Sequence, residues 1–287
     1  MSAVTTVLSI QSSVAYGYVG NSAATFPLMR MGVEVWPVLT VHFSNHTGYP
    51  SWRGPLLKAA DIAEVVQGID ERGVLGQVDA VLSGYQGAED VGAVILDAVE
   101  LVRRRNPAVV YCCDPVMGDV GRGFYVRPGI PELMRGRVVP AAQVITPNQF
   151  ELEALTGQPV RTRSELLAAA EAARALGPET VLVTSVVLAD AAPNTIEMVA
   201  IGADGAWSVS TPMLPRSFTG GGDLTAATFL DQLLRGAYLA SALERTAAVV
   251  FGVLRVTDDL GRPELALVAA QQELVVPTAR FSATRLT

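Results

Sequence analysis

The feature that most constrains the fold is the alternation of short β-rich segments with helical patterns along most of the chain. Apolar, β-branched runs bounded by turn residues predict strands over residues 4–10, 33–41, 80–83, 108–113, 143–146, 181–187 and 195–201. Apolar residues at helical spacing predict helices over residues 60–69, 90–105, 149–155, 164–176, 223–235 and 239–256. Such alternation predicts an α/β fold with a mostly parallel central sheet, helices on both faces and ligands at the carboxyl ends of the strands.

Composition limits the domain organisation and the partners. The 287 residues are 50% hydrophobic and 17% charged, without a repeat or a Pro/Gly-rich linker, so we expect one domain over residues 1–287. A net charge of −7 argues against nucleic-acid binding, and no apolar stretch is long enough to span a membrane. No Lys or Arg precedes Arg30, and the adjacent Cys112 and Cys113 make a poor disulfide, so a cytoplasmic, reduced protein is the simplest interpretation.

Oxygen-bearing side chains follow three of the predicted strands. Ser12 follows the first strand, Asp114 the strand over 108–113, and Glu151 the strand over 143–146. Each has a structural alternative as a cap, a turn residue or a first-turn helix acid. Their shared place at the ligand-binding edge favours a site, and carboxylates without nearby His or Cys ligands suit Mg²⁺ bound together with phosphate.

The usual phosphate-binding loops are missing from this chain. Lys58 is the only lysine and lies in "PLLKAAD", which excludes a Gly-Lys-Ser/Thr loop. The first strand-helix turn, "IQSSVAYGYVGNSAA", also lacks a G-x-G-x-x-G pattern. The phosphates of a bound nucleotide would therefore be held by a metal ion, by arginine and by backbone N–H groups.

The segment "SFTGGGDLTAATFL" carries three consecutive glycines and a carboxylate at the start of a predicted helix. Gly220, Gly221 and Gly222 would leave backbone N–H groups open to an anion, and Asp223 could accept a proton from an attacking hydroxyl. The alternative is a flexible turn followed by an Asp N-cap. The segment alone does not separate these two interpretations.

Several motifs together resemble the ribokinase-like kinases of small molecules, and among them the bacterial pyridoxal kinases. The resemblance runs from end to end through "LSIQSSVAYGYVGNSAATFPLMRMGVEVWPVLTVHFSNHTGYPSW", "VLSGY", "CDPVMGD", "TPNQFELEALTG", the G-x-G-D pattern at 220–223 and "FSATRL". It implies ATP-dependent phosphorylation of the 5′-hydroxyl of pyridoxal, and of pyridoxine or pyridoxamine.

The resemblance also implies roles for individual residues. Asp223 would be the general base and the three glycines the anion hole. In the pyridoxal pocket Ser12 and Thr47 would hydrogen-bond the ring, Val19 and Tyr85 would pack on it, and Gly48 would lie beside them. The ATP positions would be Asp114, Thr146, Glu151, Thr184, Arg216, Ser217, Phe218 and Thr219. Asp114 and Glu151 would act through Mg²⁺, with K⁺ as a further candidate ion.

Some positions depart from the family pattern. Thr184 stands where the family often has Lys, Ser13 where it often has His, and Gly48 where it often has Gln. The segment 117–129, "MGDVGRGFYVRPG", resembles the flap that covers the active site of these kinases, and relatives imply a homodimer. A hydroxymethylpyrimidine kinase and a non-catalytic vitamin B6-binding protein stay open as alternatives.

Overall fold

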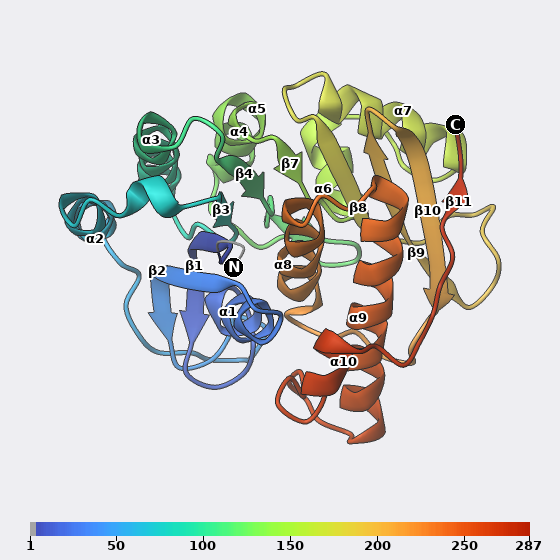
Figure 1. Cartoon of the computed structure of the whole chain (residues 1–287). Coiled ribbons are helices and arrows are strands. Elements are labelled where there is room, and N and C mark those ends of the chain that lie inside the picture. The colour runs from blue at the N-terminus through green and yellow to red at the C-terminus, as the bar shows by residue number, and fades with distance from the viewer. Residues whose placement is uncertain (1–3) are drawn as a thin grey trace.

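The centre of the molecule is a nine-stranded sheet (Figure 1). The computed structural model describes residues 4–287. The strand order is β11-β10-β9-β8-β7-β4-β3-β1-β2, and the six strands from β8 to β2 run parallel. These parallel strands are β1 (Thr6–Val14), β2 (Glu34–Phe43), β3 (Ala80–Ser83), β4 (Val110–Cys113), β7 (Val144–Ile145) and β8 (Thr180–Val186). An antiparallel extension follows, made of β9 (Thr195–Gly202), β10 (Gly205–Pro212) and β11 (Thr284–Arg285).

Helices cover both faces of the sheet, because alternate strand residues point to opposite faces. Val81 and Val183 belong to one apolar core, and their neighbours Leu82 and Leu182 belong to the other. The first core is covered by α2 (Ala59–Glu71), α3 (Glu89–Arg105), α4 (Ile130–Leu133), the π-turn η2 (Met134–Val138), α5 (Val139–Ala141), α6 (Gln149–Thr156) and α7 (Arg163–Arg174). The second is covered by α1 (Asn21–Arg30), α8 (Gly221–Leu234) and α9 (Leu239–Asp259), on which α10 (Gln271–Val275) packs. A short 3₁₀ turn, η1 (Leu75–Gln77), precedes β3.

The topology places a ligand-binding edge next to β1. From β1 the chain crosses through α1 to the edge strand β2, and it then returns past β1 to β3 and β4 (Figure 1). The helices that follow β1 and β2 lie on opposite faces of the sheet, so the strand order reverses direction between β1 and β3. Ligands of open α/β sheets bind beside such a reversal, outside the carboxyl ends of the strands.

The structure confirms the predicted α/β class with a mostly parallel sheet, and it differs in detail. The strand predicted over residues 4–10 continues to Val14 and contains an irregular register between Gln11 and Ser13. Helices α1 and α10 and strands β10 and β11 were not predicted, and α8 begins at Gly221. Pro27 hides the helical pattern of α1, and the glycines obscure the start of α8, which was predicted at residue 223.

A small hairpin extends from the end of β4. It pairs β5 (Gly118–Asp119) with β6 (Gly123–Phe124), within the segment 117–129 that resembles a flap. Across residues 4–287, no helix is both long and apolar enough to span a bilayer.

Candidate active site

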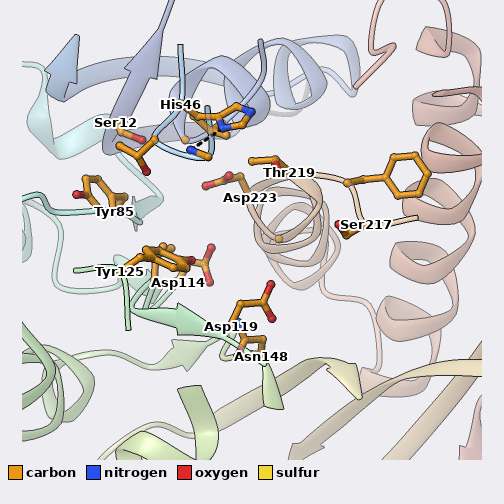
Figure 2. Close-up of a pocket in the computed structure, with 18 of the residues that line it drawn as sticks. Ser12, His46, Tyr85, Asp114, Asp119, Tyr125, Asn148, Ser217, Thr219 and Asp223 are labelled. Carbon is orange, nitrogen blue, oxygen red and sulfur yellow. Dashed lines mark hydrogen bonds between the residues drawn. The ribbon is translucent and has the colours of Figure 1, made fainter. Parts of the chain in front are cut away.

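A cavity of about 270 Å³ opens at the carboxyl edge of the parallel strands, and Figure 2 shows its walls. Its volume is close to the lower end of the range for small-molecule sites, about 300–1,000 Å³. The structure brings fifteen of the predicted site residues to this one cavity. They are Ser12, Val19, Thr47, Gly48, Tyr85, Asp114, Thr146, Glu151, Thr184, Ser217, Phe218, Thr219, Gly220, Gly222 and Asp223.

Ser12 reaches the cavity because β1 does not end at Ile10. The register of β1 against β2 shifts between Gln11 and Ser13, and this irregularity turns Ser12 into the cavity wall. Gly20 permits the close fit of α1 on this strand, since a Cβ at Gly20 would collide with the Ser12 backbone and hydroxyl oxygens. Apolar side chains of Val14, Val41 and Phe43, which the sequence analysis did not single out, complete this end of the cavity.

The start of α8 explains the three glycines in different ways. Gly220 is the N-cap with φ of 88°, and a Cβ there would collide with the Tyr18 carbonyl oxygen. Gly221 donates its N–H to the Phe218 carbonyl over 3.3 Å and is not part of the cavity wall. Gly222 lines the cavity, and no atom within residues 4–287 would obstruct a Cβ there. The alternative of an Asp N-cap is wrong, because Asp223 lies inside the first turn.

Asp223 faces the middle of the cavity, between Ser12 and Asp114 (Figure 2). Burial raises the pKa of this carboxyl from its ordinary 3.8 to about 6, although the amides of Gly20 and of Asp223 itself act in the opposite direction. The salt bridges of the described residues do not include it. The carboxylate is therefore available to a ligand.

Asp114 at the end of β4 and Glu151 in the first turn of α6 form a buried acidic pair. Burial, Glu151 and Asp223 raise the pKa of Asp114 well above its usual value, while burial raises the pKa of Glu151 to about 7. Thr146 donates its hydroxyl to Asp114 Oδ1 over 3.0 Å. Like charges held together out of water favour protonation or a bound cation. No group of three or more His, Cys, Asp and Glu suited to a metal occurs among the described residues, so a cation here would take its other ligands from substrate and water.

Glu151 also has a structural role. It completes a capping box at the start of α6, in which Asn148 N–H donates to Oε2 over 2.9 Å and Asn148 Oδ1 accepts from the Glu151 N–H. Its Oε1 accepts the N–H groups of Met117 and Gly118 over 2.8 and 3.4 Å. The helix-acid alternative for Glu151 is therefore correct, and the same carboxylate lines the cavity and anchors the β5–β6 hairpin.

Arg216 does not lie in the cavity. Its guanidinium donates to Asp258 over 2.8 Å and to the carbonyls of Arg262 and Thr257 over 2.8 and 3.0 Å, at the end of α9. It also stacks over the Phe218 ring at 4.8 Å. Its neighbours Ser217, Phe218 and Thr219 do line the cavity, so the structure separates Arg216 from the rest of this predicted group.

The departures from the family pattern have different structural consequences. Thr184 is buried in the cavity wall, and the next residue, Ser185, takes a left-handed φ of 54° that is rare outside glycine. Gly48 lies so close to His46 that a Cβ would be 2.8 Å from Nδ1, which accepts the Gly48 N–H over 3.1 Å. Ser13 does not line the cavity and contacts Ser22 instead.

Several wall residues were missed by the sequence analysis. They are Asp119, Arg122 and Tyr125 of the hairpin segment, and Asn148, His46 and Ser185. The resemblance of residues 117–129 to a covering flap was the signal for the first three, because a flap must present some of its side chains to the site. His46 lines the cavity as well as orienting its own loop.

Glu264 joins two segments of the cavity wall from behind. This buried carboxylate accepts the Tyr18 N–H over 3.2 Å and the Tyr49 hydroxyl over 2.7 Å, and it contacts His46 Nε2 over 3.1 Å. Tyr18 precedes Val19, and His46 precedes Thr47, so Glu264 fixes the loops that carry both cavity residues.

The fold and site define a class. The strand order of the sheet reverses between β1 and β3, and beside this reversal one cavity holds a helix N-terminus, an available carboxylate and an acidic pair that favours a cation. This is the arrangement of a ribokinase-like kinase of small molecules.

Comparisons with known proteins narrow this class. A family model described as phosphomethylpyrimidine kinase matches residues 61–265. The chain is 60% identical over 281 residues to the pyridoxal kinase PdxY of Rubrobacter xylanophilus, covering 98% of this chain and 97% of the relative. The pyridoxal kinase of Leishmania donovani with ADP and ginkgotoxin superposes with a TM-score of 0.93 at 30% identity, over 99% of this chain and 100% of that one. Its structure with ADP and pyridoxine gives a TM-score of 0.91 at 29% identity, over 98% and 99% of the two chains.

The chain belongs to the pyridoxal kinase family, within the group of enzymes that the phosphomethylpyrimidine kinase model describes.

Proposed function

We propose that the chain catalyses ATP-dependent phosphorylation of the 5′-hydroxyl of pyridoxal, and also accepts pyridoxine and pyridoxamine. One observation carries the proposal: Asp223 at the start of α8 faces the same cavity as Ser12, Thr47 and Tyr85. The family to which the chain belongs and the ADP and pyridoxine bound by a structural neighbour support the same reaction.

Asp223 is the general base of this reaction. The 5′-oxygen forms a bond to the γ-phosphorus of ATP, the bond from that phosphorus to the β,γ-bridging oxygen breaks, and the hydroxyl proton passes to the carboxylate. A pKa of about 6 leaves most of Asp223 unprotonated at neutral pH while making it a stronger base than an ordinary aspartate. The Gly222 N–H group of the first helical turn and the positive end of the helix dipole stabilise the charge on the transferred group.

The vitamin ring occupies the mixed apolar and hydroxyl end of the cavity. Ser12 and Thr47 donate and accept hydrogen bonds with its polar substituents, while Val19 and Tyr85 pack on its faces. The His46 imidazole, which also lines the cavity, occupies the place that a side chain at Gly48 would take. Burial raises the pKa of Tyr85, so its hydroxyl stays neutral and able to donate at physiological pH.

The nucleotide occupies the other end, near Thr146, Thr184 and residues 217–219. Asp114 and Glu151 fit Mg²⁺, because both are buried carboxylates whose raised pKa values report a site that favours a cation. Asp114 is the more available of the two, since both Glu151 oxygens already accept backbone N–H groups. Bound Mg²⁺ would neutralise phosphate charge during the transfer.

Three further properties belong to the proposal: a homodimer from the family resemblance, a cytoplasmic location from the composition and the adjacent cysteines, and a stimulating effect of K⁺ from the family resemblance. Light scattering after size-exclusion chromatography measures the first. Replacement of K⁺ by tetramethylammonium in the assay tests the last, and equal rates in the two salts would exclude a K⁺ requirement.

A coupled ATP-consumption assay tests the reaction itself. The purified protein is supplied with pyridoxal, pyridoxine, pyridoxamine or hydroxymethylpyrimidine, and the phosphorylated product is identified by mass spectrometry. We expect pyridoxal to give the highest kcat/KM. The description of the matching family model favours hydroxymethylpyrimidine as the second candidate, and a preference for it would replace the proposal. Tight vitamin binding without turnover would indicate a non-catalytic binding protein.

A further inference from the structure

The cavity wall carries much more negative than positive charge. Four carboxylates line it, those of Asp114, Asp119, Glu151 and Asp223. A nucleoside triphosphate brings several further negative charges, and one divalent cation does not neutralise them all. A site that transfers phosphate therefore needs another cation near the transferred group.

The expected sources of that cation are absent from the wall. Thr184 replaces the family's lysine, and Arg216 is held by Asp258 and two carbonyls at the end of α9. The chain's single lysine, Lys58, precedes α2 and does not line the cavity. Among residues 4–287, Arg122 is the one lysine or arginine side chain on the cavity wall.

The β5–β6 hairpin carries Arg122 onto the cavity wall and lies beside Asn148, which bridges to Thr184 at the nucleotide end. Arg122 lies in the turn, where its N–H donates to the Asp119 carbonyl over 3.2 Å. The hairpin base is tied to α6 by the Glu151 contacts and by Asn148 Nδ2, which donates to the Gly118 carbonyl over 2.8 Å. Phe124 also packs edge-on against Phe150 of α6, with 5.0 Å between ring centroids.

The guanidinium itself is available to a ligand. It lies 5.2 Å from the centre of the Tyr125 ring, and no salt bridge within the described chain involves it. The side chain is exposed to solvent. A weak cation–π contact orients the group and can be exchanged for two charge-assisted hydrogen bonds to phosphate oxygens.

We infer that Arg122 is the phosphate-binding cation of this kinase, which contacts the β- and γ-phosphates of ATP and the group in transfer. The inference rests on the proposed function. It assigns to the hairpin the positive charge that Thr184 and Arg216 do not supply to the phosphates. It makes the covering segment part of the catalytic machinery in addition to a barrier against water.

Two variants of Arg122 test this assignment. Arg122→Met keeps the apolar stem and removes the charge, while Arg122→Lys keeps the charge and loses the two-pronged geometry. Calorimetric titration with Mg²⁺–ATP should show binding weakened about 10- to 100-fold in Arg122→Met, the usual effect of losing hydrogen bonds to a charged group. Arg122→Lys should recover part of the loss. Adenosine, which has no phosphate, should bind equally to all three proteins.

Steady-state kinetics separate this role from a structural one. Arg122→Met should raise the KM for ATP and lower kcat, while the KM for pyridoxal stays within about twofold. Arg135→Met is the matched control, because Arg135 is exposed on η2 and lines a groove outside the active-site cavity. Adding Thr184→Lys to Arg122→Met should restore ATP binding, since the second change returns a positive charge to the same cavity.

The inference is overturned if Arg122→Met binds Mg²⁺–ATP as tightly as Arg135→Met does and has the same kcat. Equal losses for ATP and adenosine would also overturn it, because they would indicate a distorted pocket. The proposed function fails separately, when the unaltered protein transfers no phosphate to any vitamer. The titration with ATP needs no turnover and remains decisive in that case.

Discussion

Replacing Asp223 with asparagine should affect catalysis and stability in opposite directions. Asparagine has nearly the same shape and keeps an oxygen toward the Gly20 amide, but it cannot take a proton from the substrate hydroxyl. We expect kcat to fall by about 10²- to 10⁴-fold, the usual contribution of a general base, with pyridoxal affinity preserved.

The stability effect follows from the pKa of the carboxyl. Folding raises that pKa from 3.8 to about 6, so the folded state binds the proton more tightly than the unfolded state. Stability is therefore lost as pH rises from 3.8 through 6, and the full loss persists above that range. One pKa unit corresponds to about 1.4 kcal/mol, and after allowance for partial solvent contact the loss at neutral pH is about 1–3 kcal/mol.

Asparagine carries no charge and avoids this loss. The variant should melt about 2–6 °C above the parent at pH 7.5, at roughly 2 °C per kcal/mol for a chain of this size, and the two Tm values should converge below pH 4. Differential scanning fluorimetry across pH and a coupled kinase assay measure the two effects. Asp231→Asn is the matched control on the same helix. It breaks the 2.9 Å contact with Arg235, so it should lower Tm and leave turnover near the parent value.

Turnover in Asp223→Asn within threefold of the parent would refute the general-base role. If the Tm of Asp223→Asn differs from that of the parent by the same amount at pH 4 and at pH 7.5, the electrostatic account of its stability is refuted.

Three other perturbations probe the rest of the site. Thr184→Lys should lower the KM for ATP severalfold because it places a cation in the cavity wall; an unchanged or higher KM in steady-state assays would show that this position does not face phosphate. Removal of divalent ions with EDTA should stop turnover, and added Mg²⁺ should restore it; full activity in EDTA would rule out a metal at Asp114 and Glu151. Glu264→Gln should raise the KM for pyridoxal about 10-fold, while the KM for ATP stays unchanged, because a carboxylate that fixes the two substrate loops is lost. Glu273→Gln, at a buried carboxylate bonded to Thr278, is its control, and equal changes in both KM values for Glu264→Gln would indicate general loosening.

Local patterns carried enough information to predict the fold class and the oxygen-bearing residues at the strand ends, while the family resemblance supplied most of the other predicted cavity residues. Strand and helix periodicity depends on each segment's own residues, so alternating segments were recognised and their order implied a parallel sheet. Once the sheet was inferred, the side chains after its strands had to meet at one edge. Asp114 and Glu151 do lie on the same cavity for this reason.

Other features depend on contacts that no local pattern encodes. The extension of β1 beyond Ile10 depends on pairing with β2, and that extension places Ser12. Strands β10 and β11 at the sheet's antiparallel end were missed, as was α1 with its internal proline. In each case packing against distant segments outweighs a weak local preference.

The sequence by itself determined the α/β class, the oxygen-bearing residues at the strand ends and the glycine-rich start of α8, because these depend on neighbours along the chain. Only the tertiary structure decided which charges reach the cavity: it ties Arg216 to α9, brings Arg122 in on a hairpin, and connects Glu264 to a loop 218 residues away through His46. Charge acts over a few ångströms of space, and distance along the sequence does not fix distance in the folded chain.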